Sequence, residues 1–542
     1  MRSSTLVCDT ITTLRDLTLQ VQAEEDTLRL GGGEAGRERQ KRLGRLTVRE
    51  RLDVLLDGDA PFYELGLWAA WRMYPEWGEV PAAGAVTGIG RVHGRPVMVI
   101  ANDATVKAGA FFPQSVKKVL RAQRIAMAFR LPLIYLVDSA GVFLPLQDEV
   151  FPDEDDFGRI FRNNSVISAM GIPQYAAVMG SCVAGGAYLP VLCDTLLMTE
   201  GSQLFLAGPA LVQAAIGQIA DPEELGGARM HAEISGTVDY REPDDRACLH
   251  RLRSLLGLLP EERSPADMVA GSPPQCDVQD LYETVPANGR REYDAHELLN
   301  SVVDGGSLQE YKAQYGRTLV VAFARIAGRA VGIVANQRLR TRTGRGELQI
   351  GGVLYADSVE KAARFVMQCN QQGLPIVFFQ DVQGFMVGRQ AEQSGIIRAG
   401  AKLVNAVSNS VVPKLSVIVG GSFGAGDYAL CGKAYDPWLI LAWPCARYAV
   451  MGAEQAADTL VSIRAREAER EGHPLGPQEK EQVREAIRHR YEQQSDIRYA
   501  AARGWVDAII PPHMTRDWLA MAMSILPQTN NRPQFRTGVL QV

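Results

Sequence analysis

Short runs of apolar, often β-branched residues alternate along the chain with segments whose apolar residues recur at helical spacing. The runs at 97–101, 133–137 and 175–179 are apolar throughout, which predicts buried strands. Residues 115–129 carry apolar side chains at helical spacing with Lys and Arg between them, which predicts an amphipathic helix. Helices that follow strands in this order favour right-handed crossovers, so we expect α/β domains with largely parallel sheets.

This pattern is repeated in the second half of the chain. A Gly-Arg turn and a strand that ends in Ala-Asn occur at 94–102 and again at 328–336. A strand that opens on Leu-Pro and leads to an Asp and then a Gly occurs at 131–141 and again at 374–384. Because the copies keep their order and nearly their spacing, the sequence indicates a domain duplication with small loop insertions.

We therefore expect an N-terminal domain at 1–280 and a C-terminal domain at 281–542. The Pro-rich segment 259–288 predicts the linker between them, and the basic stretch 338–346 predicts an inserted loop. Residues 464–494 are dense in Glu, Arg and Gln around a Gly-His-Pro turn. They predict a surface helical hairpin, either solvated or packed against another subunit.

Composition agrees with two soluble α/β domains. The chain has 542 residues, of which 46% are hydrophobic and 22% charged, so it has ample material for two cores. Its net charge of −5 gives no basis for a nucleic-acid or anionic-membrane partner. The N-terminus lacks the apolar core of a secretory signal, and no uncharged run reaches the roughly 18 residues of a membrane span. We expect a cytoplasmic protein with no membrane partner.

The eight cysteines and seven histidines are scattered, and no Cys-x-x-Cys pair occurs. Metal sites built from these residues need clustered ligands at characteristic spacings. The sequence therefore predicts no metal in this chain and favours buried free thiols.

A third repeated segment, a strand that runs into a turn of Gly and Ala, lies at 178–188 and 417–428. Backbone N–H groups at such a turn point into open space and suit a developing oxyanion. The candidate donors are the amides of Gly185, Gly186, Ala425 and Gly426. Two such turns can stabilise two oxyanions and so join two enolate-like reactants, although each turn alone is also typical of tight packing.

Several motifs together resemble one known family. They lie at 101–109, 137–141, 151–153, 157–159, 179–188, 384–388 and 450–457. From about residue 45 to its end, the chain resembles the carboxyltransferase (β) subunit of biotin-dependent acyl-CoA carboxylases. The resemblance is closest to the methylcrotonyl-CoA and propionyl-CoA carboxylase branch.

This resemblance implies two tandem crotonase-like (ββα-superhelix) domains and a ring-shaped homohexamer. It also implies an enzyme of the ligase or transferase class, which moves a carboxyl group from carboxybiotin to the α- or γ-carbon of an acyl-CoA. The N-terminal turn would then serve the acyl thioester and the C-terminal turn biotin. Decarboxylated biotin is basic enough to take the substrate proton, so no side-chain base is expected.

The resemblance extends to binding residues. The biotin-binding candidates are Phe423, Gly424, Ala425 and Gly426. The acyl-CoA candidates are Ala184, Phe205, Tyr428 and the basic residues Lys107, Lys117, Lys118 and Arg121. Basic side chains can pair with the CoA phosphates, but a solvated helix face explains them equally well, and aromatic residues are more often core.

The chain departs from the family at three positions. Gln213 and Gln218 stand where relatives tend to have Lys and Glu, and Asp427 stands where Asn is usual. The first two departures lie after the Gly-Pro at 208–209, near the expected acyl pocket, and can signal an unusual substrate.

The chain also lacks an Ala-Met-Lys-Met biotinylation motif and a Gly-rich ATP-binding motif. We therefore expect biotin on a partner subunit with biotin carboxylase and biotin carrier functions. Two alternatives stay open: a subunit of a biotin-dependent decarboxylase or transcarboxylase, and a non-catalytic ring scaffold.

Overall fold

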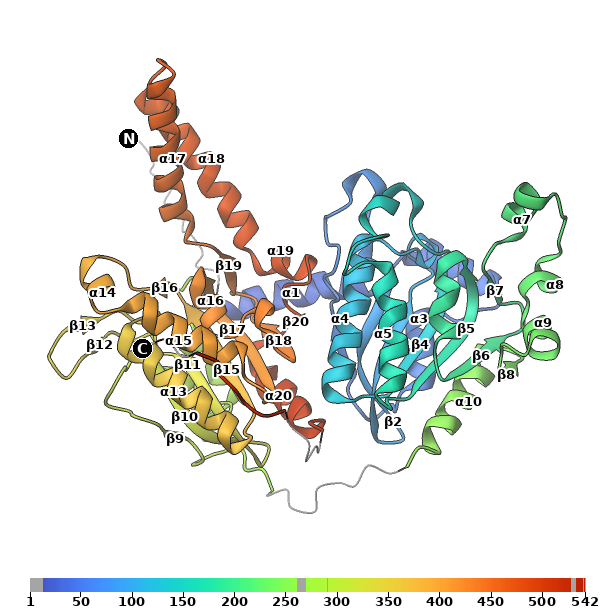
Figure 1. The fold of residues 1–542 in the computed structure, drawn as a ribbon, viewed down its shortest axis with the longest axis horizontal. Helices are drawn as coiled ribbons and strands as arrows, with labels where there is room; N and C mark the ends of the chain where they lie inside the picture. Colours follow the sequence, from blue (N-terminus) through green and yellow to red (C-terminus); the bar gives the residue numbers. More distant parts are fainter. Residues whose placement is uncertain (1–12, 261–269, 290, 528–532, 540, 542) are drawn as a thin grey trace, which may run out of the picture.

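The computed structural model describes residues 13–260, 270–289, 291–527, 533–539 and 541. The first half folds around a sheet in the order β1-β2-β3-β4-β5-β6-β8, with β7 paired to β5 (Figure 1). Its strands are β1 (Tyr63–Leu65), β2 (Ala85–Val92), β3 (Arg95–Asn102), β4 (Leu133–Ser139), β5 (Gln174–Val183), β6 (Thr195–Thr199), β7 (Gln203–Phe205) and β8 (Tyr240–Glu242). The β1-β2-β3 meander is antiparallel, and all pairings beyond β3 are parallel.

The helices of this half cover its sheet and lead into and out of it. They are α1 (Leu14–Arg29), α2 (Gly33–Arg42), α3 (Val48–Leu55), α4 (Pro113–Phe129), α5 (Phe157–Ala169), α6 (Tyr188–Val191), α7 (Pro209–Ile216), α8 (Pro222–Gly226), α9 (Ala228–Met230) and α10 (Asp245–Gly257). The strands expected at 97–101, 133–137 and 175–179 and the helix expected at 115–129 are all confirmed.

The second half repeats this plan in the order β20-β18-β17-β15-β11-β10-β9, with β19 paired to β17. Its strands are β9 (Gln309–Glu310), β10 (Leu319–Ile326), β11 (Arg329–Asn336), β15 (Ile376–Val382), β17 (Lys414–Phe423), β18 (Leu439–Ala442), β19 (Arg447–Ala449) and β20 (Ala508–Ile509). Its helices are α11 (Leu281–Thr284), α12 (Ala295–Asn300), α13 (Ala356–Gln372), α14 (Arg389–Gln393), α15 (Ile396–Ser408), α16 (Ala425–Ala429), α17 (Ala453–Arg470), α18 (Pro477–Ser495), α19 (Ile497–Ala502) and α20 (Thr515–Ser524).

Two small sheets accompany the second half. They are β12 (Thr341–Arg342) with β13 (Leu348–Gln349), and β14 (Val353–Leu354) with β16 (Gly384–Phe385). The first of them contains most of the expected inserted loop at 338–346.

The duplication extends to turn chemistry. The β2-β3 hairpin turns through His93 and Gly94, both at positive φ, and the Asp57 carboxylate accepts both of their N–H groups. The β10-β11 hairpin turns through Ala327 and Gly328, also at positive φ, and a second carboxylate, that of Asp304, accepts both N–H groups. Two positive φ values in a two-residue loop match the right-handed twist of the strands.

The two halves meet along α4 and β18. Arg121 on α4 forms a bidentate ion pair with Asp507, at 2.7 and 2.8 Å, and Lys433 lies 2.9 Å from the same carboxylate. Although burial alone would raise the pKa of Asp507, the charges of Arg121 and Lys433 hold it well below its usual range. Phe129 packs edge-on against Trp438 beside this seam.

The boundary expected at residue 280 stays a prediction, because α1 contacts both halves: Arg15 lies over the Tyr282 ring, and Glu25 accepts from Trp68. The expected linker at 259–288 falls partly outside the described residues, at 261–269. Its remainder includes a short helical turn (Val278–Asp280) and α11.

The helical hairpin expected at 464–494 is confirmed as α17 and α18, which project from the second half (Figure 1). Arg484 on α18 pairs with Glu454 and Asp458 on α17. Among the described residues, no helix combines the length and apolar character needed to cross a membrane. The cytoplasmic location stays a prediction.

Candidate active site

The first Gly turn follows the central strand of the first sheet. Strand β5 is flanked by β4 and β6, and its last three residues pair with β7. The chain then enters a 3-10 turn, Ala184–Ala187, that continues into α6. A Cβ at Gly186 would lie 4.0 Å from Gly141 Cα and Phe157 Cζ, at ordinary contact distance. A side-chain carbon therefore fits at this position without a clash.

The second Gly turn follows β17 in the same way. Gly424 has φ of 56° and ψ of −144°, a conformation that favours glycine, and α16 begins at the next residue. A Cβ at Gly424 would lie 2.9 Å from the Val450 carbonyl oxygen. The N–H groups of Ala425 and Gly426 belong to the first turn of a helix, so they have no acceptor within that helix.

Both turns are arranged in the same way. In each half, a buried strand leads directly into a turn whose first amides are the predicted oxyanion donors. Fixed amides of this kind need no reorganisation when charge develops, and removing one such donor typically costs about 100-fold to 1,000-fold in rate. The two turns lie in different halves of the chain, the first after β5 and the second after β17 (Figure 1).

Comparison with known proteins identifies the family of this chain. The carboxyl transferase domain family matches residues 39–539. The chain belongs to this family. It is 47% identical over 498 residues to the biotin-dependent 3-methylcrotonyl-coenzyme A carboxylase beta1 subunit of Mycobacterium tuberculosis, covering 92% of this chain and 91% of the relative. It is 40% identical to the mitochondrial methylcrotonoyl-CoA carboxylase beta chain of Dictyostelium discoideum, covering 98% and 89%.

Among solved structures, the beta subunit of geranyl-CoA carboxylase from Pseudomonas aeruginosa superposes with a TM-score of 0.86 at 34% identity, covering 100% of this chain and 99% of that one. The expected resemblance and the two crotonase-like domains are thus confirmed. The protein is an enzyme, the carboxyltransferase subunit of a biotin-dependent acyl-CoA carboxylase.

The aromatic candidates lie next to the two turns of the carboxyltransferase. Phe205 ends β7 and pairs with Val183, and its ring lies against Gly208 and Gly226. Phe423 ends β17, directly before Gly424. Tyr428 on α16 is half exposed and borders a surface hollow of about 380 Å³. The backbone of Ala184 opens the first turn. Their roles in binding stay predictions.

The four basic candidates divide into two kinds. Burial lowers the pKa of the Lys118 ammonium to about 7, and its Nζ donates to the carbonyls of Ala82 and Ala85. Arg121 is the seam residue paired with Asp507. Lys107 and Lys117 are exposed, and Lys107 donates to the Trp77 carbonyl. The role of all four residues in CoA binding stays a prediction.

The departures from the family are placed as follows. Gln213 on α7 and Gln218 just beyond it are both exposed, on a segment that also exposes Leu211 and Ile216.

Within the described residues, no group of three or more His, Cys, Asp and Glu side chains is arranged to hold a metal ion.

Asp427 lies in the second Gly turn, and the sequence marked it only as an unusual residue type. It follows Gly426 directly, is partly buried, and its Oδ1 accepts from Ser422 Oγ at 2.8 Å. Burial raises the pKa of Asp427 from 3.8 to about 6, against the lowering effect of Ser422.

This raised pKa predicts a pH dependence. Because the folded chain binds the Asp427 proton more tightly than the unfolded chain, its contribution to stability is complete below about pH 4 and is lost as the pH rises through about 6. We expect Asp427→Asn to remove that loss in melting temperatures measured from pH 4 to 8. We expect Ser422→Ala to move the loss to higher pH, and an unchanged profile in both variants would contradict the assignment.

Proposed function

We propose that this carboxyltransferase moves the carboxyl group of carboxybiotin, carried on a partner subunit, to a branched, unsaturated acyl-CoA such as 3-methylcrotonyl-CoA. The observation that carries the proposal is the pair of strand-to-turn junctions, one in each half, that present amides suited to two oxyanions. The substrate class is supported by the name of the relative at 47% identity.

The chemistry needs one turn for each reactant. Removal of a proton from the acyl-CoA leaves an enolate, whose negative oxygen the amides of Gly185 and Gly186 hold. Carboxybiotin, when bound on this side, would supply the carboxyl group and a base for the substrate proton. The amides of Ala425 and Gly426 hold the negative charge on that side, and Phe423 and Gly424 border the same turn.

We propose further that each site is shared between two chains of a homohexamer. The two turns lie in different halves of the chain, after β5 and after β17 (Figure 1), and we infer that the turn facing each of them comes from a second chain. Large apolar side chains are exposed beside both turns, namely Tyr188, Val191, Tyr428, Val450 and Met451. Such a surface suits contact with a second copy of the chain.

An acyl-CoA panel tests the function directly. With the biotinylated partner, ATP and bicarbonate, we expect carboxylation of 3-methylcrotonyl-CoA to exceed that of propionyl-CoA and geranyl-CoA by about 10-fold or more in kcat/KM, since a pocket fitted to one chain discriminates by roughly that much. The chain without its partner is expected to show no ATP-dependent carboxylation.

Covalently bound biotin on this chain would contradict the division of labour between the subunits. Turnover of a carboxylated acyl-CoA with no carboxylation in the ATP-dependent assay would instead indicate a decarboxylase. Equal rates on all three acyl-CoAs would contradict the proposed substrate class.

A further inference from the structure

Each Gly turn is preceded by an irregularity at the same place in the sheet. In the first half, β4 pairs with β5 at Val137↔Val178 and next at Ser139↔Cys182, so β5 contains extra residues opposite Asp138. In the second half, β15 pairs with β17 at Gln380↔Ile418 and next at Val382↔Ser422. The same extra length therefore lies opposite Asp381. A register shift of this kind leaves backbone groups without ladder partners.

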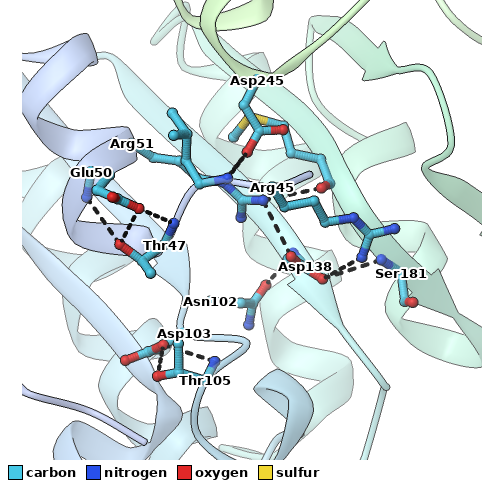
Figure 2. Close-up of polar contacts among 12 residues, drawn as sticks. Arg45, Thr47, Glu50, Arg51, Asn102, Asp103, Thr105, Asp138, Ser181 and Asp245 are labelled. Carbon is cyan, nitrogen blue, oxygen red and sulfur yellow. Dashed lines mark hydrogen bonds and ion pairs between the residues drawn. The ribbon is translucent and has the colours of Figure 1, made fainter. Parts of the chain in front are cut away.

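In both halves an aspartate carboxylate satisfies the freed N–H group. Asp138 Oδ1 accepts from Ser181 N at 3.2 Å (Figure 2), and Asp381 Oδ1 accepts from Gly421 N at 2.7 Å. Both aspartates are buried, at 3% and 2% exposure. Their own N–H groups donate to Asn102 Oδ1 and Asn336 Oδ1, which are also repeated residues.

The glycine before each anchored N–H leaves room for the carboxylate. A Cβ at Gly180 would lie 2.0 Å from Asp138 Oδ1, and one at Gly420 would lie 2.4 Å from Asp381 Oδ1. Beyond these points β5 leaves β6 and pairs with β7, and β17 leaves β18 and pairs with β19. Each carboxylate thus lies at the point where its strand changes partner and runs on to its Gly turn.

The partners that neutralise the two carboxylates differ. Asp138 pairs with Arg51 of α3 at 3.2 Å, and Arg51 also holds Asp245 of α10 (Figure 2). Asp381 instead pairs with Arg338, which follows β11, at 3.1 Å and accepts from the Tyr293 hydroxyl. The bend, the aspartate and the anchored N–H are common to both halves, whereas their surroundings are not. This indicates that the common part serves the turns.

We propose that Asp138 and Asp381 are positioning residues for the two oxyanion turns. Each carboxylate holds the strand end four residues before a predicted donor, Ser181 before Gly185 and Gly421 before Ala425, and so sets the direction of the amides. The expected effect of the two aspartates on catalysis rests on the proposed function. Their expected effect on the turn backbone rests on the geometry alone.

Asp138→Asn tests the first half, with Asp245→Asn as its matched control. Both variants remove one carboxylate from buried Arg51, but only the first touches the strand end. On an acyl-CoA that the wild type carboxylates, we expect Asp138→Asn to lower kcat about 10-fold to 100-fold and to keep KM within about 3-fold. This loss of rate does not exceed the loss expected when a whole oxyanion donor is removed. Asp245→Asn is expected to lower the melting temperature but keep kcat within about 3-fold.

Asp138→Glu keeps the charge for Arg51 while moving the carboxylate, and the same loss of kcat is expected for it. In the second half, Asp381→Asn is compared with Tyr293→Phe, which removes only the hydroxyl that donates to Asp381 Oδ2. We expect Asp381→Asn to lower kcat and Tyr293→Phe not to lower it.

Amide hydrogen exchange provides a readout that does not depend on the substrate. We expect faster exchange at 181–187 in Asp138→Asn and at 421–426 in Asp381→Asn, each without change in the other half. A wild type inactive on every acyl-CoA would overturn the proposed function, while exchange would still test the positioning role. Unchanged exchange in both aspartate variants, or equal kcat losses in variants and controls, would overturn the inference.

Discussion

Gly186→Val is expected to lower kcat/KM for the acyl-CoA by at least about 100-fold, because it blocks one preorganised oxyanion donor worth roughly 3 kcal/mol in the transition state. The first carbon of the new side chain has room, since a Cβ there lies 4.0 Å from Gly141 Cα and Phe157 Cζ. The branched methyl groups then occupy the space that the thioester must enter. The loss should therefore appear in activity rather than in stability.

Two measurements separate these effects. The melting temperature of Gly186→Val is expected to stay close to that of the wild type, and docking of the biotinylated partner should be retained. Gly186→Ala, which adds only the tolerated carbon, should lose less activity than the Val variant. A Gly186→Val variant with full turnover would show that this turn only packs.

Gly426→Val is expected to abolish carboxyl transfer from the biotin side to a similar degree, at least about 100-fold, and also to destabilise the fold. A Cβ at this position would lie 2.6 Å from Val382 Cγ2, inside normal contact distance. Overpacking of this kind typically costs about 1–3 kcal/mol. Acyl-CoA binding, which we assign to the other half, should remain.

Adding Val382→Ala to Gly426→Val distinguishes the effect on stability from the effect on carboxyl transfer. In the double variant Gly426→Val with Val382→Ala, the clash with Val382 is relieved, so the melting temperature should recover toward that of the wild type while transfer stays low. Recovery of transfer together with stability would mean that Gly426 matters only for packing.

Much of this architecture could be predicted from the sequence because the signals are local or repeated. Apolar runs identified β3, β4 and β5, and the repeated Gly turns identified the strand-to-turn junctions before any geometry was known. The division into α/β halves followed from the same repeats. These features depend on residues near one another in the chain, where periodicity is informative.

Long-range pairings could not be predicted in this way. The amphipathic pattern of α4 shows that Arg121 is not core, but not that it faces Asp507, 386 residues further on. The same pattern does not reveal that Lys118 turns inward to the Ala82 and Ala85 carbonyls. Arg338 lies in a basic stretch typical of a loop, yet it is buried against Asp381.

Asp138 and Asp381 show a different limit. Both stood in the repeated segments, so the repeat itself marked them as shared by the two halves. Their role depends on a register shift between neighbouring strands, which changes which N–H groups lack a partner. No property of the isolated strand reports that shift, because it arises from pairing between strands.

Calorimetric titration of acyl-CoA into the two Val variants shows whether the two turns serve different reactants. We expect Gly186→Val to lose binding of the acyl-CoA and Gly426→Val to bind it with wild-type affinity. We expect the reverse pattern for docking of the biotinylated partner. Normal acyl-CoA binding and full turnover in both variants would contradict the two-turn mechanism and leave the glycines as packing residues.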